Sequence, residues 1–159
     1  MKVLGIDPGT SVTGYGVVEY DGNGKPGFGR LIECGVIRFA KQSLLPRRLA
    51  ELYEGIVDLI ERHHPTALAI ETAFYHKNVH TTLVLGHARG VVLLAAQQHE
   101  LDIAQYSPAT VKKAVVGVGG APKAQVAAMV ARLLRLKHAP RPADAADGVA
   151  VALTHIIRS

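Results

Sequence analysis

The sequence predicts an α/β domain built on a five-stranded mixed β-sheet, with its first three strands antiparallel and α-helices on both faces. Three observations support this fold class. The first forty residues hold short apolar runs separated by turn-forming residues, the next twenty carry apolar residues at helical spacing, and helical and strand patterns then alternate. Strands joined by short loops are most simply antiparallel, whereas strands separated by helices favour a mixed sheet covered on both faces. A chain of 159 residues fits one domain, which we place at residues 1–159.

Three strands are predicted in the N-terminal part. Val3 to Ile6 is a short apolar strand, the turn DPGT follows it, and residues 14–19 return as the second strand. A turn-rich segment, DGNGKPGFG, then leads to a third strand over residues 30–39. These runs predict a meander.

The rest of the chain alternates helical and strand patterns. Apolar residues from Leu45 to Ile60 follow steps near 3.6 and predict a helix with a proline in its first turn. Short strands are expected at residues 67–70 and 102–106, with a long helix at 81–100 between them. The pair Ser107–Pro108 and two later prolines, Pro122 and Pro142, are typical of helix starts and predict the last three helices.

Composition narrows the class of protein. Hydrophobic residues make up 48% of the chain, which is enough for a packed core, and the single cysteine excludes a disulfide framework. The longest apolar run, residues 90–96, is shorter than the ~18–20 residues that span a bilayer, and Asp7 interrupts any export signal. We therefore expect a cytoplasmic protein with no membrane partner. The net charge of +5 favours a polyanionic partner such as nucleic acid.

Four carboxylates stand where a core pattern would not place them. Asp7 and Glu71 end two predicted strands, and Asp144 and Asp147 lie three residues apart on one face of the last helix. Each of the first three also has a structural explanation: a turn residue, a solvated strand end and a first-turn acid favoured by the helix dipole. Asp147 precedes GVAVAL, so we expect its face to point inward.

Taken together, the four acids predict a divalent-metal site. Carboxylates gathered at one sheet edge repel one another unless a positive charge lies among them, and no Lys or Arg immediately flanks any of the four. Oxygen-only ligands favour Mg²⁺ or Mn²⁺ over zinc. Two such ions ~3.5–4 Å apart can activate a water and stabilise the leaving oxygen during phosphodiester cleavage. Acids that hold metal and a basic surface that holds nucleic acid together indicate a nuclease.

At these residues the chain resembles the RuvC family of bacterial crossover-junction endodeoxyribonucleases, in the ribonuclease-H-like superfamily. The resemblance covers essentially the whole chain. It is carried by GIDPGTSVTGYGVV (5–18), AIETAFYHKN (69–78), LGHARGVVLLAA (85–96), YSPATVKKAVVGVGGAPKAQV (106–126) and DAADGVAVALTH (144–155). The order and spacing of these stretches are specific, which a single acidic motif would not be.

The resemblance implies a homodimer that binds a four-way DNA junction and nicks two strands of like polarity symmetrically, in recombination and repair. It implies a ribonuclease-H-like fold and Asp7, Glu71, Asp144 and Asp147 as ligands of two Mg²⁺ ions per active site, with Mn²⁺ as a substitute. It also implies the RuvAB branch-migration complex as a partner.

Further residues have DNA-contacting roles by the same resemblance. Phe74 matches an aromatic that contacts unstacked bases, and stacking on a base contributes roughly 1–3 kcal/mol. Lys112 and Lys123 match basic residues near the cut strand, and we assign Lys123 a catalytic role as well. Tyr75 and Lys113 are less specific neighbours of these residues. The alternative for the aromatics is packing onto the core, and for the lysines a solvated face.

Other interpretations stay open at this point. The motif DPGTSVTGYG also resembles the first phosphate loop of actin-like kinases and ATPases, but such an ATP cleft needs two domains of this size. A ribonuclease-H-like nuclease acting on RNA or other branched substrates is a nearer alternative, and a catalytically silent junction-binding module is a third.

His76 and His80 have the spacing of a zinc pair but no evident third ligand, so a DNA-facing surface is the simpler interpretation. The GxxxG pair Gly86 and Gly90 indicates close helix packing, which we expect across the two-fold axis of the dimer.

Overall fold

A computed structural model describes residues 1–22, 29–40, 42–72 and 77–159. The elements follow the predicted order of three strands, then helix, strand, helix, strand and three helices. They are β1 (Lys2–Asp7), β2 (Val12–Glu19), β3 (Arg30–Arg38), α1 (Leu45–His63), β4 (Ala67–Glu71), α2 (Val79–Gln98), β5 (Asp102–Tyr106), α3 (Pro108–Val116), α4 (Lys123–Leu133) and α5 (Ala143–Arg158).

The five strands form one mixed sheet in the order β3-β2-β1-β4-β5. β1 pairs with β2 and β2 with β3 in antiparallel fashion, as the short connecting loops predict. β4 lies parallel to β1, and β5 lies parallel to β4. The carboxyl ends of β1 and β4 therefore meet at one edge of the sheet, which is the edge that carries the predicted acids.

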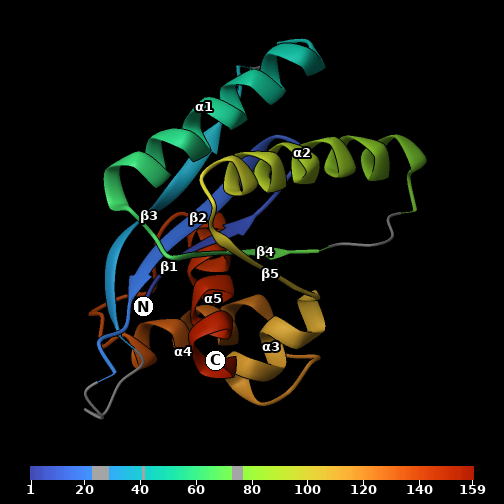
Figure 1. The fold of residues 1–159 in the computed structure, drawn as a ribbon. Coiled ribbons are helices and arrows are strands. Elements are labelled where there is room, and N and C mark those ends of the chain that lie inside the picture. The colour runs from blue at the N-terminus through green and yellow to red at the C-terminus, as the bar shows by residue number, and fades with distance from the viewer. Residues whose placement is uncertain (23–28, 41, 73–76) are drawn as a thin grey trace.

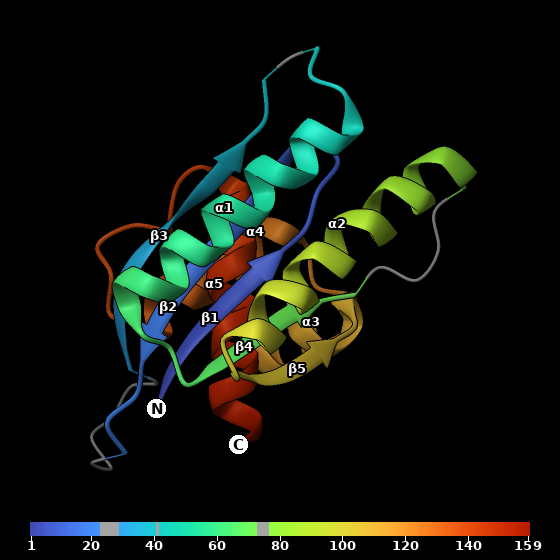
Figure 2. The same ribbon diagram turned by 45° about the horizontal axis from the view of Figure 1, so that its top comes forward.

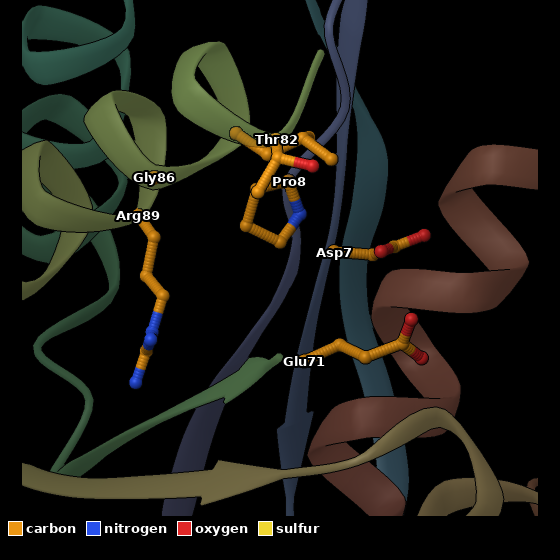
Figure 3. A pocket seen from close by; sticks show the side chains of 7 residues that line it. Asp7, Pro8, Glu71, Thr82, Gly86 and Arg89 are labelled. Carbon is orange, nitrogen blue, oxygen red and sulfur yellow. The ribbon is translucent and has the colours of Figure 1, made fainter. Parts of the chain in front are cut away.

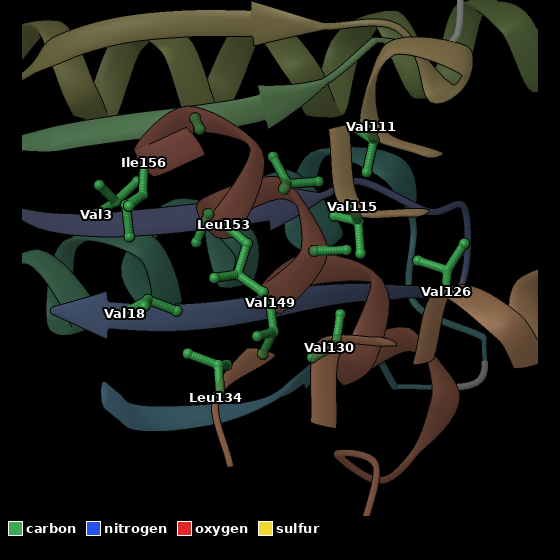
Figure 4. Close-up of a cluster of buried hydrophobic side chains, with 14 of the residues drawn as sticks. Val3, Val18, Val111, Val115, Val126, Val130, Leu134, Val149, Leu153 and Ile156 are labelled. Atoms are coloured by element: carbon green, nitrogen blue, oxygen red, sulfur yellow. The ribbon is translucent and has the colours of Figure 1, made fainter. Parts of the chain in front are cut away.

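Helices cover both faces of the sheet, as expected. α1 and α2 lie on one face, while α5, with α3 and α4 beside it, lies on the other (Figures 1 and 2). Strand alternation divides the apolar residues between two cores: Leu4, Ile6 and Val17 face α1 and α2, whereas Val3 and Val18 face α5. Figure 4 shows the second core, in which Val149 and Leu153 of α5 pack against the sheet.

Side-chain caps mark the starts of α2 and α3, and prolines mark the starts of α4 and α5. Ser107 accepts a hydrogen bond from the Thr110 amide at the start of α3, and Pro122 and Pro142 stand at the N-caps of α4 and α5, as predicted. α2 begins two residues earlier than expected. The side chain of Asn78 caps it by accepting hydrogen bonds from the amides of His80 and Thr81, at 2.9 and 3.3 Å.

α2 exposes an unusual amount of apolar surface. Val79, Leu83 and Leu94 are 73%, 60% and 52% exposed, and Gly86 and Gly90 lie between them on the same face. We call these five residues the α2 stripe. By length and composition alone α2 is also apolar enough to cross a membrane, with a mean hydropathy of 1.4 over an 18-residue window that is 22% buried. The longest apolar run in the sequence did not indicate such a helix. Polar residues divide the apolar residues of α2 into short runs, but they do not lower its mean hydropathy below this level.

Candidate active site

Asp7 and Glu71 come together because β1 and β4 are parallel neighbours. Ile6 pairs with Ile70 in the register of the two strands, so the acids follow at equivalent positions. Alternation along each strand turns both side chains to the face that α5 covers. Figure 3 shows the two carboxylates pointing from the strand ends toward α5.

Asp144 and Asp147 are brought to this edge by close packing of α5 on the sheet. Asp144 lies in the first turn of α5, and Asp147 lies three residues further along. A Cβ atom on Gly148 would lie 2.5 Å from the Cα of Tyr15, and a Cβ atom on Gly14 would overlap the carbonyl oxygen of Asp144. Glycine at these two positions therefore lets the helix backbone approach β2 more closely than any side chain would allow.

The result is a compact carboxylate cluster. Asp7, Asp144 and Asp147 each offer a carboxylate oxygen, and these atoms lie within 4.8 Å of one another. Glu71 joins Asp7 in lining two cavities on either side of the strand ends, of about 210 and about 120 Å³. The structure thus brings together the four acids that the sequence singled out.

Burial and mutual repulsion make this cluster electrostatically costly. Burial raises the pKa of Asp7 well above its usual range, and the charges of Glu71, Asp147 and Asp144 raise it further. Burial likewise raises the pKa of Glu71, with the Asp147 charge as the next cause. The Lys123 ammonium lowers both pKa values, but it offsets only part of these effects. A site of this kind gains stability from a cation that the protein does not itself supply.

One counter-charge comes from a residue distant in sequence. The Lys123 ammonium donates a hydrogen bond of 2.9 Å from Nζ to Oδ2 of Asp147. No Lys or Arg flanks the acids in the sequence, and this cation reaches the site from α4, 24 residues before Asp147. The Lys123 side chain is 74% exposed, so its ammonium is accessible to a ligand that approaches the acids.

The other two lysines differ in position. Lys112 lines the 120 Å³ cavity together with Asp7, Glu71 and Lys123, and its charge lowers the pKa of Glu71. Lys113, the next residue of α3, is exposed and does not line that cavity. Of the two, the geometry therefore favours Lys112 as a site residue. Phe74, Tyr75 and His76 lie outside the described residues, while His80 is exposed in the first turn of α2.

α2 contributes to this region, which the sequence patterns did not predict. Thr82, Gly86 and Arg89 of α2 line the 210 Å³ cavity beside Asp7 and Glu71 (Figure 3). The Arg89 guanidinium also donates to the side-chain oxygen of Gln105 on β5. The helical spacing of these three residues, four and three apart, was a usable signal, because it places them on one face of α2.

The donor set suits hard divalent cations. All four acids offer oxygen atoms, which Mg²⁺ and Mn²⁺ prefer, and among the described residues neither a cysteine nor a histidine lines either cavity. The raised pKa values of Asp7 and Glu71 are the expected property of carboxylates arranged for a cation. The residues present therefore fit a magnesium site.

A family model, a curated relative and two solved structures agree on the proteins that this chain resembles. The family model described as crossover junction endodeoxyribonuclease RuvC matches residues 3–155. A crossover junction endodeoxyribonuclease RuvC from Alkaliphilus metalliredigens is 46% identical over 155 residues, which cover 98% of this chain and 92% of the relative. The structure of Thermus thermophilus RuvC is similar with a TM-score of 0.89 and 37% identity, covering 99% of this chain and 94% of that one. The same protein in complex with a Holliday junction substrate gives a TM-score of 0.91 at the same identity and coverage.

Proposed function

Because the chain belongs to the RuvC family of crossover junction endodeoxyribonucleases, we propose that it resolves four-way DNA junctions by metal-dependent hydrolysis at the carboxylate cluster. The observation that carries this proposal is the convergence of Asp7, Asp144 and Asp147 within 4.8 Å, beside Glu71. The reaction is phosphodiester cleavage in homologous recombination and DNA repair. We propose that residues 1–159 act as one ribonuclease-H-like domain.

We assign the metal-holding role to the four acids. Asp7, Glu71, Asp144 and Asp147 would hold two Mg²⁺ ions, and Mn²⁺ would substitute because it accepts the same oxygen donors. When bound, such ions supply an activated water and stabilisation of the leaving oxygen. The chain's own contribution is to fix the acids on two strand ends and one helix, so that little reorganisation is needed when the phosphate arrives.

The lysines complement the acids. We propose that Lys123 contacts the phosphate at the cut and that Lys112 binds the same strand from the other side of the cavity. Lys123 begins α4, where the free amides of the first turn also favour an anion. Its ion pair with Asp147 holds the ammonium at the site before DNA binds. Lys113 is a weaker candidate, and base stacking by Phe74 and Tyr75 stays a prediction from the family resemblance.

A homodimer would match the symmetry of the reaction. Two sites related by a two-fold axis nick two strands symmetrically, and we propose that the α2 stripe forms this interface. Among the described residues, a Cβ atom at Gly86 or Gly90 would meet nothing within 4 Å, so the packing of these residues does not require glycine there. α2 has 20 residues and is about 30 Å long. A second copy of the chain packed on the α2 stripe would bury this exposed apolar face, which would otherwise be apolar enough for contact with a membrane.

The cellular setting follows from the substrate. We propose that the chain works in the cytoplasm, where bacterial DNA lies, and together with the RuvAB branch-migration complex, as the family resemblance implies.

The decisive experiment compares three substrates with the same enzyme preparation. A synthetic four-way junction, a linear duplex of the same sequence and an RNA–DNA hybrid are incubated with Mg²⁺, and products are resolved on denaturing gels. We expect paired nicks in the junction and little cutting of the other two. Preferential cutting of the hybrid would instead favour a ribonuclease, and junction binding without cutting would favour a silent binding module.

A further inference from the structure

A larger cavity lies at the same edge of the sheet, on the side of β3. Its volume is about 500 Å³, and it is lined by Ser11, Arg38, Phe39, Ala40, Gln42, Ser43 and Arg48. Arg38 ends β3 and pairs in register with Val12, the residue with which β2 begins after the turn from Asp7. The cavity is therefore a neighbour of the carboxylate cluster across the β1–β2 turn, on the side away from the three lysines.

Arg48 is held in place at this cavity. Its guanidinium donates to the carbonyl oxygen of Thr10 in the β1–β2 turn and lies 5.4 Å from the centroid of the Phe39 ring. A guanidinium carries five N–H donors, so the bond to Thr10 leaves others for a ligand. Stacking on Phe39 and anchoring to Thr10 reduce the rotamer freedom that Arg48 would lose when it binds an anion.

Arg38 lacks a counter-charge. It is exposed, and its side chain makes no hydrogen bond or ion pair with another residue in the part of the chain that the structure describes. None of the described residues that line the cavity is acidic, whereas Ser11 and Ser43 add hydroxyl groups. Two arginines with hydroxyl groups and no carboxylate form a surface that attracts an oxyanion.

We propose that Arg38 and Arg48 bind a backbone phosphate of the junction DNA, a few nucleotides from the scissile phosphate. Thr10, to which Arg48 is anchored, is three residues from Asp7, so their Cα atoms are at most about 11 Å apart. A DNA strand carries a phosphate for about every 3.4 Å of helix axis, so a strand that crosses the acids reaches this cavity within a few nucleotides. This inference rests on the proposed function and adds a second anchor for the substrate, opposite Lys112 and Lys123.

Arg38→Ala tests the proposal without endangering the fold, because the side chain is exposed and unpaired among the described residues. Binding to a synthetic four-way junction is measured by fluorescence anisotropy in an Asp7→Asn background, over a series of salt concentrations. We expect Kd to rise about ten-fold and the slope of log K against log salt to become shallower by about 1. Arg30→Ala is the matched control. It removes the same charge from the opposite end of β3, where Arg30 pairs with Glu19, and we expect unchanged binding.

A neutral phosphate analogue locates the contact. Methylphosphonate is placed at successive positions of the cleaved strand. At one position, a few nucleotides from the cut, it should weaken junction binding by the protein that contains Arg38. The same analogue should leave the already weaker junction binding of Arg38→Ala unchanged. Junction binding that is equally strong with and without Arg38 overturns the phosphate site alone and leaves the proposed function standing. Absence of any junction binding by the parent protein overturns both.

Discussion

Gly14 of β2 and Asp144 of α5 are packed so closely that a Cβ atom on Gly14 would overlap the Asp144 carbonyl oxygen. The contact joins the strand that follows the Asp7 turn to the first turn of the helix that carries two more acids. The geometry of the carboxylate cluster therefore depends on a backbone contact that involves none of the carboxylates.

Gly14→Ala should damage the site through this contact. The added methyl group must push the start of α5 away from β2, because the atom it meets is backbone and cannot rotate aside. We expect a loss of stability of about 1–3 kcal/mol, typical of overpacking, and a weaker increase in melting temperature on addition of Mg²⁺. Thermal unfolding with and without Mg²⁺ measures both. Gly120→Ala is the control, because a Cβ atom there would meet no described residue within 4 Å, and it should behave like the parent protein.

Lys123→Ala should separate catalysis from binding. Lys123 is the cation hydrogen-bonded to Asp147, and we propose that it contacts the scissile phosphate. Its loss should therefore slow the reaction, whereas the remaining basic surface should still hold the DNA. We expect single-turnover cleavage to fall by roughly 100-fold, of the order found for single electrostatic groups at reacting centres, and Kd to change several-fold at most. Equal losses in rate and binding would make Lys123 an ordinary phosphate contact. Lys137→Ala, exposed beyond the end of α4, controls for the change in net charge.

Asp7→Asn should abolish cleavage and yet make the metal-free protein more stable. The pKa of Asp7 in the folded chain is raised above its unfolded value, so the stability associated with this group is full at low pH and is lost as pH rises through the folded pKa. An amide keeps the shape and removes the charge. We therefore expect a higher melting temperature than the parent protein in EDTA at pH 7–9, by several degrees, with a smaller difference at pH 5.

Mg²⁺ should reduce or reverse this difference in melting temperature between Asp7→Asn and the parent protein. If Asp7 is one of the Mg²⁺ ligands, as we propose, Mg²⁺ will stabilise the folded parent protein more than it stabilises Asp7→Asn. The gap in melting temperature should then close or invert when EDTA is replaced by Mg²⁺. Glu54→Gln, an exposed acid of α1, is the control and should show neither effect. A metal-free Asp7→Asn protein that melts below its parent would contradict the assigned charge repulsion.

The parts of this site that the sequence predicted are those set by local periodicity. Asp7 and Glu71 end apolar strands that the topology makes parallel neighbours, and Asp144 and Asp147 are three apart on a helix whose start a proline signals. The two-residue period of the strands places the first pair of acids at one edge of the sheet, and the 3.6-residue period of the helix places the second pair on one face of α5. The expectation that the edge and the face meet came from the number of acids without a flanking cation, and the family resemblance implied the same four residues.

Patterns within one element do not predict contacts between distant elements. The ion pair of Lys123 with Asp147 depends on how α4 packs beside α5. The cavity lined by Arg38 and Arg48 depends on the position of α1 relative to the end of β3. Neither is a property of spacing along one element. The close approach at Gly14 and Gly148 likewise follows from helix-on-sheet packing, since a glycine in a strand pattern indicates only that some backbone comes near.

Leu83→Asp should disrupt the proposed dimer. Leu83 is 60% exposed in the single chain, so a charge there costs the monomer little, whereas in a dimer formed through the α2 stripe it would be buried without a partner. We expect the parent protein to sediment as a dimer at micromolar concentration and Leu83→Asp as a monomer that no longer makes paired nicks. Ala50→Asp, exposed on α1, should leave the dimer intact. A parent protein that is monomeric under these conditions would contradict the interface.

A polar cluster around Glu33 ties α1 to the antiparallel strands, and it should give stability a second dependence on pH. The Glu33 carboxylate accepts hydrogen bonds from Tyr15 at 2.8 Å and from Arg62 at 2.7 Å, and it lies 2.7 Å from Nε2 of His63. The bond from Arg62 is the largest cause that lowers the pKa of Glu33 to about 2. The folded pKa lies below the unfolded value, so this contribution is full above about pH 4.5 and is lost as pH falls toward 2.

Glu33→Gln should therefore lower the melting temperature at neutral pH by more than it does in acid. Hydrogen bonds to charged groups contribute ~1.5–3 kcal/mol, and partial exposure of the carboxylate places the expected loss near the lower end, about 3–6 °C for a chain of this size. Thermal unfolding of both proteins between pH 3 and 7 should show the difference shrinking below pH 4.5. Glu61→Gln, an exposed acid of α1 beside Arg62, should give no such trend. A difference that stays constant across this range would mean that Glu33 acts through packing and not through its charge.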